Sequence, residues 1–117
     1  MRETALKDIK RMYMQLLTAK PPFFTAADYS IESFATDLGT NRSYASRFVN
    51  RELGVTFSTL LNKLRLAHFI KRKSETPQAT ITHLAKECGF NSTFSFRRAF
   101  LKEYGMLPGE YFRNMRK

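Results

Sequence analysis

With 117 residues, the chain can form one compact domain or two very small ones that share an element, and it is too short to hold a separate sensor or catalytic domain as well. Hydrophobic residues make up 43% of the sequence, and the 11 Phe residues are enough to build such cores, which excludes a disordered chain. The formal net charge of +10 points to a polyanionic partner, either nucleic acid or an acidic membrane surface.

Several chemical classes are excluded by what the sequence contains. The single cysteine, Cys88, cannot form an internal disulfide, and no CxxC or Cys/His cluster is present, so we expect no metal and no cofactor. Cys88 and the two histidines, His68 and His83, have no third group to orient them as a nucleophile pair, so we do not expect an enzyme. Charges interrupt the N-terminal apolar residues, and no segment is long enough to span a membrane, so we expect a cytoplasmic protein without a membrane partner.

The hydrophobic periodicity is helical throughout, which predicts an all-α fold of about seven helices. A first helix is expected at about 4–19, because Pro21 and Pro22 end it, followed by a loop over 22–29. Its predicted inward stripe consists of Ala5, Ile9, Met12 and Leu16.

The segment 30–54 has the pattern of a short helix, a tight turn and a longer helix. Ser30 is the expected N-cap of the first helix, which ends at Gly39, and Asn41 is the expected N-cap of the second, which runs to Leu53. A long helix follows over about 56–73, with Thr56 as its cap. We expect its inward residues to be Leu60, Leu61, Leu64, Ala67 and Ile70, and its solvent-facing residues to be Lys63, Arg65, Lys71 and Arg72.

A second short-turn-long pattern is expected over 80–105, followed by a last helix over about 107–117. Thr80 should cap its first helix, which ends at Gly89, and either Asn91 or Ser92 should cap its second. Pro108 suits the first turn of the last helix, where a missing amide proton costs least.

These two segments are copies of one unit. Ile31, Ala35, Gly39 and Asn41 recur after a spacing of 50 residues as Ile81, Ala85, Gly89 and Asn91. With one residue inserted in the second turn, Arg47, Glu52 and Gly54 then recur as Arg98, Glu103 and Gly105. A short helix, a tight turn and a longer helix match the helix-turn-helix order, in which the second helix enters the major groove. A duplicated helical hairpin without a nucleic-acid role is the alternative.

The stretch GFNSTFSFRRAFLKEYGMLPGEYF, over 89–112, resembles the signature of the AraC/XylS family of bacterial transcription regulators. The first copy, with Leu38-Gly39, Ser46-Arg47 and Glu52-Leu53-Gly54, is similar to that family as well. The resemblance implies two helix-turn-helix subdomains joined by a long central helix. It also implies duplex DNA as the partner and, for members that activate transcription, RNA polymerase.

Helical phase predicts which residues would contact bases. In the first proposed recognition helix the outward residues are Ser43, Ser46, Arg47 and Asn50. Arg47 can donate two hydrogen bonds to guanine, whereas the serines can bond to bases or phosphates with little selectivity. Alternatively, Arg47 pairs with an acid such as Glu52 or with a phosphate.

In the second helix the outward residues are Thr93, Phe94, Arg97 and Arg98, of which Arg98 is the counterpart of Arg47. Phe94 stands where the family usually has a polar residue. Its ring either packs back onto the domain or touches a thymine methyl group.

Phosphate contacts are expected from two sources. Asn41 and Asn91 lie at helix starts, where free backbone amides bind anions, although capping alone would explain both. Lys71 and Arg72 belong to the long helix, which holds five basic residues and no acidic one over 56–73.

Together these features predict sequence-specific binding of duplex DNA in two neighbouring major-groove segments, about 34 Å apart. We expect no small-molecule ligand within this chain. The alternative function is a basic helical module that binds a protein or RNA partner without reading DNA sequence.

Overall fold

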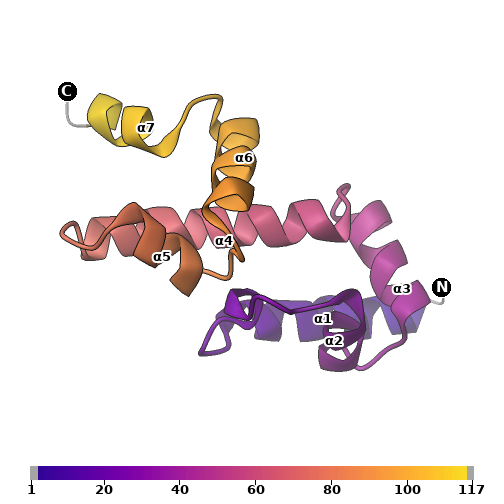
Figure 1. The fold of residues 1–117 in the computed structure, drawn as a ribbon. Coiled ribbons are helices and arrows are strands. Elements are labelled where there is room, and N and C mark those ends of the chain that lie inside the picture. Colours follow the sequence, from indigo (N-terminus) through magenta and orange to yellow (C-terminus); the bar gives the residue numbers. More distant parts are fainter. Residues whose placement is uncertain (1–2, 116–117) are drawn as a thin grey trace. The chain divides into compact units, whose positions relative to one another are not determined.

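The computed structural model describes residues 3–115, which contain seven α-helices and no β-strand (Figure 1), so the predicted all-α fold is confirmed. The helices are α1 (Glu3–Thr18), α2 (Ile31–Asp37), α3 (Arg42–Arg47), α4 (Phe57–Glu75), α5 (Ile81–Glu87), α6 (Thr93–Tyr104) and α7 (Pro108–Met115). A 3-10 turn, η1 (Phe23–Thr25), precedes α2, and a π-helical stretch, η2 (Phe48–Glu52), continues α3. Positions 116 and 117 of the predicted last helix lie outside the described residues.

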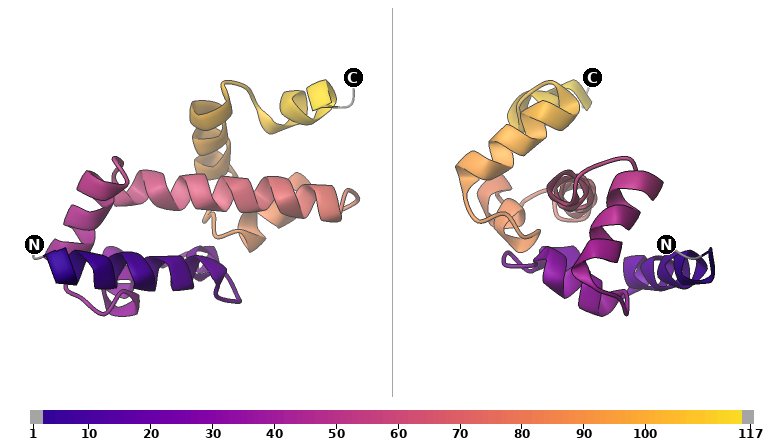
Figure 2. Two further views of the ribbon diagram at one scale, coloured as in Figure 1. Left: turned by 180° about the vertical axis from the view of Figure 1, so that it is seen from behind. Right: turned by 90° about the vertical axis from the view of Figure 1, so that its right-hand side faces the viewer.

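The chain divides into two compact units, with the boundary between Leu61 and Asn62 inside α4. The first unit contains α1, η1, α2, α3, η2 and the start of α4, and the second contains the rest of α4 with α5, α6 and α7. The left view of Figure 2 shows α4 as one uninterrupted helix. Each unit is described by itself below.

Aromatic side chains build the core of the first unit. The ring of Tyr13 in α1 meets Phe34 of α2 and Phe48 of η2 edge to face, with centroids 6.1 and 5.4 Å apart. Ile9 is buried as predicted, whereas Tyr13, outside the predicted stripe, is buried as well. The expected loop over 22–29 is partly structured, because Phe24 in η1 is buried and Phe23 stacks on Phe34.

The core of the second unit is centred on Phe69 of α4. Its ring lies 4.7 Å from that of Phe96 and 6.2 Å from that of Phe100, both in α6. Leu84 and Cys88 from the α5 segment complete this core, and both are fully buried. The two helices of this pair therefore both contribute fully buried apolar side chains to one core.

The predicted orientation of α4 is wrong at Arg65 and Ala67, although Ile70 packs against the core and Lys71 is exposed, as predicted. Leu66 and Phe69 are buried at 1% and 0% exposure, whereas Ala67, expected inside, is exposed. Arg65, expected in solvent, is buried at 8% exposure, with its guanidinium carbon 6.0 Å from the centre of the Phe90 ring. Because α4 serves two cores in succession, its apolar face is not one continuous stripe, and a single 3.6-residue pattern fails to describe it.

The tight turns of the two helix pairs have the same hydrogen bonds. After α2, the amide of Gly39 donates to Thr36 at 3.0 Å and that of Thr40 to Ala35 at 2.9 Å. After α5, the amides of Gly89 and Phe90 donate in the same pattern to Lys86 and Ala85, both at 3.1 Å. This arrangement needs a left-handed residue, and glycine supplies it with φ of 71° at Gly39 and 107° at Gly89. The first helix of each pair therefore ends in the same way.

Candidate nucleic-acid interface

The second helices of the two pairs present matched outward stripes. Ser43, Ser46, Arg47 and Asn50 lie at helical spacings of three, four and seven residues, and Phe94, Arg97, Arg98 and Leu101 repeat those spacings on α6. Seven of the eight side chains are exposed, and Ser46 is half-buried. We call these the first stripe and the second stripe.

The N-caps establish which residues of the two helices correspond. The Asn41 side chain accepts a hydrogen bond from the Tyr44 amide at 2.9 Å, and Ser92 accepts one from the Ser95 amide at 3.1 Å. Ser92, not Asn91, is therefore the counterpart of Asn41, and Asn91 is the inserted residue of the second turn. Of the two residues predicted as possible caps, Ser92 caps α6 and Asn91 does not. A phosphate contact by Asn91 would therefore have to come from its exposed side chain in the turn.

The first stripe borders an open, polar depression of 480 Å³. It is lined by Arg42, Ser43, Ser46, Arg47, Asn50 and Arg51. Arg42 is tied to Glu32 of α2 by a 3.1 Å ion pair, and Asn50 donates a long hydrogen bond of 3.5 Å to Ser46. Arg42 and Arg51 were not among the predicted contact residues, although their positions on the same side of the helix could have indicated them.

Arg47 is not engaged by an acid in this structure. Its guanidinium carbon lies 5.9 Å from the centre of the Tyr44 ring, one turn back on α3. Glu52, the acid considered as its partner, instead pairs with Lys10 of α1 at 3.6 Å. Arg47 therefore keeps its donors free for an external acceptor, as far as residues 3–115 are concerned.

The second stripe borders a depression of 440 Å³ at the corresponding place on α6. It is lined by Thr93, Phe94, Arg97, Arg98, Leu101 and Leu107. Phe94 is 73% exposed, so the alternative in which its ring packs back onto the domain is wrong. Leu101 and Leu107, which the sequence analysis missed, are also exposed, at 49% and 41%. The seven-residue spacing from Phe94 could have indicated Leu101, but only the structure brings Leu107 to the same surface.

Most basic side chains of α4 are already held by groups of the second unit. Lys63 pairs with Glu103 of α6 at 2.9 Å, and Arg65 is buried. The Lys73 ammonium donates to the backbone carbonyls of Pro77 and Ala79 at 2.8 and 2.7 Å, which fixes the turn after α4. Fewer basic side chains of this helix are therefore available for phosphate contacts than its sequence suggests.

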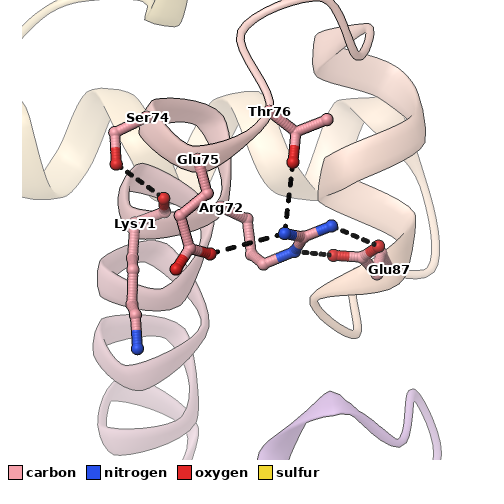
Figure 3. A network of polar contacts seen from close by, with 6 residues as sticks. All are labelled: Lys71, Arg72, Ser74, Glu75, Thr76 and Glu87. Carbon is pink, nitrogen blue, oxygen red and sulfur yellow. Dashed lines mark hydrogen bonds and ion pairs between the residues drawn. The ribbon is translucent and has the colours of Figure 1, made fainter.

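Arg72, expected in solvent as a phosphate contact, lies at the centre of a polar network (Figure 3). Its Nε and Nη2 atoms donate to the two carboxylate oxygens of Glu87 at 2.7 and 3.3 Å, and its Nη1 donates to Glu75 and Thr76 at 3.4 and 3.2 Å. The carboxylate of Glu87 raises the pKa of Arg72, and the guanidinium lowers the pKa of Glu87. Arg72 thus fastens α5 to α4.

Lys71, the neighbour of Arg72, points away from this network (Figure 3). Its backbone carbonyl accepts a hydrogen bond from the Ser74 hydroxyl at 2.7 Å, while its side chain is exposed. Among the five basic residues of α4 over 57–73, Lys71 is the one whose charged group has no partner within the described chain.

The structure also brings together three groups of metal-ligand type, which the sequence had not suggested. Ligand atoms of His68, Glu87 and Cys88 lie within 4.8 Å of one another. Both Glu87 oxygens, however, accept hydrogen bonds from Arg72, whose positive charge opposes a cation at this place. Burial also raises the pKa of the Cys88 thiol to about 12, which disfavours the thiolate that a metal needs. The cluster therefore fits the packing of α5 on α4 better than a metal site.

None of the helices in the described part of the chain combines the length and the apolar character that a bilayer span requires.

Comparisons with known proteins bear on this surface. A helix-turn-helix domain family matches residues 34–114 of the chain. The chain is 29% identical over 89 residues to the RCS-specific HTH-type transcriptional activator RclR of Escherichia coli, covering 76% of this chain and 31% of that protein. It is 32% identical over 97 residues to the ornithine utilization regulator of Pseudomonas aeruginosa, covering 83% and 27%. An uncharacterized HTH-type transcriptional regulator of Staphylococcus aureus is 32% identical over 84 residues, covering 72% and 11%. The chain thus spans less than a third of each of these relatives.

Two solved structures are similar to this one. The C-terminal domain of AraT, a response regulator from Geobacillus stearothermophilus, has a TM-score of 0.74 and 28% sequence identity, covering 92% of this chain and 84% of that one. A protein of unknown function from Listeria innocua has a TM-score of 0.70 at 22% identity, covering 88% and 92%, and supports the fold alone.

Proposed function

The chain belongs to the AraC-type helix-turn-helix family of DNA-binding transcription regulators, and we propose on this basis that it binds duplex DNA sequence-specifically through α3 and α6. The observation that carries the proposal is the pair of matched stripes, one on the second helix of each helix pair. Both contain arginines that have no ion pair with a carboxylate within residues 3–115. A helix-turn-helix contacts base edges with this part of its second helix.

In the proposed complex, Arg47 and Arg98 each donate two hydrogen bonds to a guanine in the major groove. They hold equivalent positions, six residues after the caps Asn41 and Ser92. Ser43, Ser46 and Asn50 would bond to bases beside Arg47, and Thr93 and Arg97 to bases or phosphates beside Arg98. The two helices would occupy neighbouring major-groove segments about 34 Å apart.

Phosphate contacts would come from the helix starts and from Lys71. The amides at the start of α3, beside Asn41, suit a phosphate, and Asn91 can donate from the second turn. Arg72 would reach a phosphate only by exchanging its bonds to Glu87, so we propose it chiefly as the residue that holds α5 in place.

The biological role we propose is regulation of transcription in a bacterial cytoplasm, without catalysis by this domain. RNA polymerase is the proposed protein partner if the regulator activates. Because this chain spans less than a third of these relatives, their activities as whole proteins are not assigned to it.

A selection on randomised duplexes, followed by competition with excess random DNA, tests the proposal. We expect one selected motif with two parts, a complex that resists the competitor, and an affinity that falls steeply between 50 and 200 mM salt. Equal affinity for all duplexes would overturn sequence-specific binding. Equal or tighter binding to single-stranded RNA would favour the alternative of a basic module without DNA readout.

A further inference from the structure

Phe94, Leu101 and Leu107 form an exposed apolar patch on the second unit, which its fold does not require. They are 73%, 49% and 41% exposed, whereas the aromatic residues that pack the core from the same helix, Phe96 and Phe100, are fully buried. Counted from the caps, the counterparts of Phe94 and Leu101 are the polar residues Ser43 of α3 and Asn50 of η2. An exposed apolar surface of this kind marks a place where something binds.

The charges beside the patch indicate that its occupant is DNA. Arg97 and Arg98 lie between Phe94 and Leu101 on the same helical stripe, and both are exposed. No carboxylate of the described chain pairs with either of them. A mixed apolar and strongly basic surface on the first turns of a helix complements the major groove, where phosphates flank the base edges.

The only apolar group that a base pair presents in the major groove is the C5-methyl of thymine. A 5-methylcytosine carries the same group at the same ring position. Phe94 is the second residue of α6, so its ring extends from the end of the helix that contacts bases, and Leu101 follows two turns later.

We propose that α6 reads pyrimidine 5-methyl groups through Phe94 and Leu101, whereas α3 reads its half-site through polar groups alone. This inference rests on the proposed function, because it names the chemistry by which the second helix discriminates between bases. It implies that the second half-site distinguishes thymine from cytosine by one methyl group, and that 5-methylation of a cytosine there strengthens binding.

The test uses the duplex selected for the intact chain, with single bases exchanged. The half-site of α6 is defined as the bases at which Arg98→Ala relaxes the preference. Replacing the thymines there by deoxyuridine removes only methyl groups, and we expect about a fourfold loss of affinity at a position that contacts Phe94. Replacing such a thymine by 5-methylcytosine, paired with guanine, should bind better than unmethylated cytosine by a similar factor.

The Phe94→Ala variant tests the protein side of the same contact, because a 73% exposed ring can be removed without opening the core. It should weaken binding to the thymine duplex and abolish the difference between thymine and deoxyuridine. Met14→Ala, which removes a 63% exposed side chain from α1, is the control and should leave both affinities unchanged. Circular dichroism should show intact helicity in both variants.

The outcomes separate the two proposals. An intact selected motif with no effect of deoxyuridine beneath α6 overturns methyl reading and leaves sequence-specific binding standing. Unchanged DNA affinity of Phe94→Ala, together with loss of transcription activation, overturns it in favour of a protein partner at the patch. A chain that selects no motif at all contradicts the proposed function itself.

Discussion

The two units have cores of the same design, but the exposed stripes on their second helices differ. In each, an aromatic residue of a long helix, Tyr13 or Phe69, packs against aromatic residues of the helix pair, and the same glycine turn ends the first helix of the pair. The stripes differ: the first consists of two serines, an arginine and an asparagine, and the second of a phenylalanine, two arginines and a leucine. The core restricts which residues a position accepts, whereas the exposed stripe is restricted only by what it binds.

Substitutions in the two cores should have the largest effects on stability. Phe34→Ala in the first unit and Phe69→Ala in the second each remove a fully buried ring, and each should lower the free energy of unfolding by about 3–5 kcal/mol. Amide hydrogen exchange should show the loss of protection concentrated in the mutated unit. Ala67→Ser, on the exposed side of α4, is the control. Equal loss of protection in both units would show that they unfold as one.

The arginines test whether both stripes contact bases. Arg47→Ala and Arg98→Ala should each cost about 1–3 kcal/mol of binding free energy and relax the preference only at the bases beneath the mutated helix. Selection on randomised duplexes measures this, with a melting curve to verify the fold. If Arg98→Ala leaves the selected motif unchanged, the second helix does not read guanine, and only the first stripe makes this contact.

The two units should respond differently to acid, because the acids at equivalent positions have different partners. Glu87 has a pKa lowered below its ordinary value of 4.5 by Arg72, so its contribution to stability is present above pH 4.5 and is lost as the pH falls below it. The equivalent acid of the first unit, Asp37, accepts instead from the Tyr29 hydroxyl at 2.5 Å. Burial, with this bond, raises the pKa of Tyr29, so its contribution is complete below pH 10.0 and is lost as the pH rises above it.

We therefore expect acid to weaken the second unit first, as measured by hydrogen exchange or by unit-specific spectroscopic probes. Alkali should weaken both units, the first through Tyr29 and the second through the buried thiol of Cys88, whose pKa is also raised. Glu87→Gln should flatten the acid response, and Tyr29→Phe the alkaline response of the first unit. An acid response that survives in Glu87→Gln would assign it to other carboxylates.

The smallest effects are expected for the neighbours Lys71 and Arg72. Lys71→Ala should reduce the slope of log affinity against log salt by about one, weaken all sequences alike and leave stability unchanged. Arg72→Ala should lower the melting temperature of the second unit, because it leaves Glu87 and Glu75 without their partner. The reverse assignment, a salt effect from Arg72 alone, would show that its network opens on DNA.

Local rules were sufficient for the helix pairs and failed where the structure depends on distant residues. Ser30, Asn41 and Thr80 cap their helices as predicted, since a cap is decided within four residues. The positions of the Arg65 and Arg72 side chains could not be predicted in this way, because Phe90 and Glu87, which they contact, come from the turn after α5 and from α5 itself. The outward stripes followed from helical phase, but whether Phe94 packs inward depended on neighbouring elements that periodicity does not describe.

The position of Asn91 has a geometric consequence for the second unit. An extra residue inside α6 would turn every later side chain by about 100° around the helix axis, and Arg98 would leave its stripe. Since the residue lies before Ser92, the helix starts afresh at its own cap, and the angular positions of all later residues are unchanged. The turn therefore accommodates an added residue that would have disrupted the stripe inside the helix. Counted from their caps, the residues of the two stripes keep the same angular positions although the two turns differ in length.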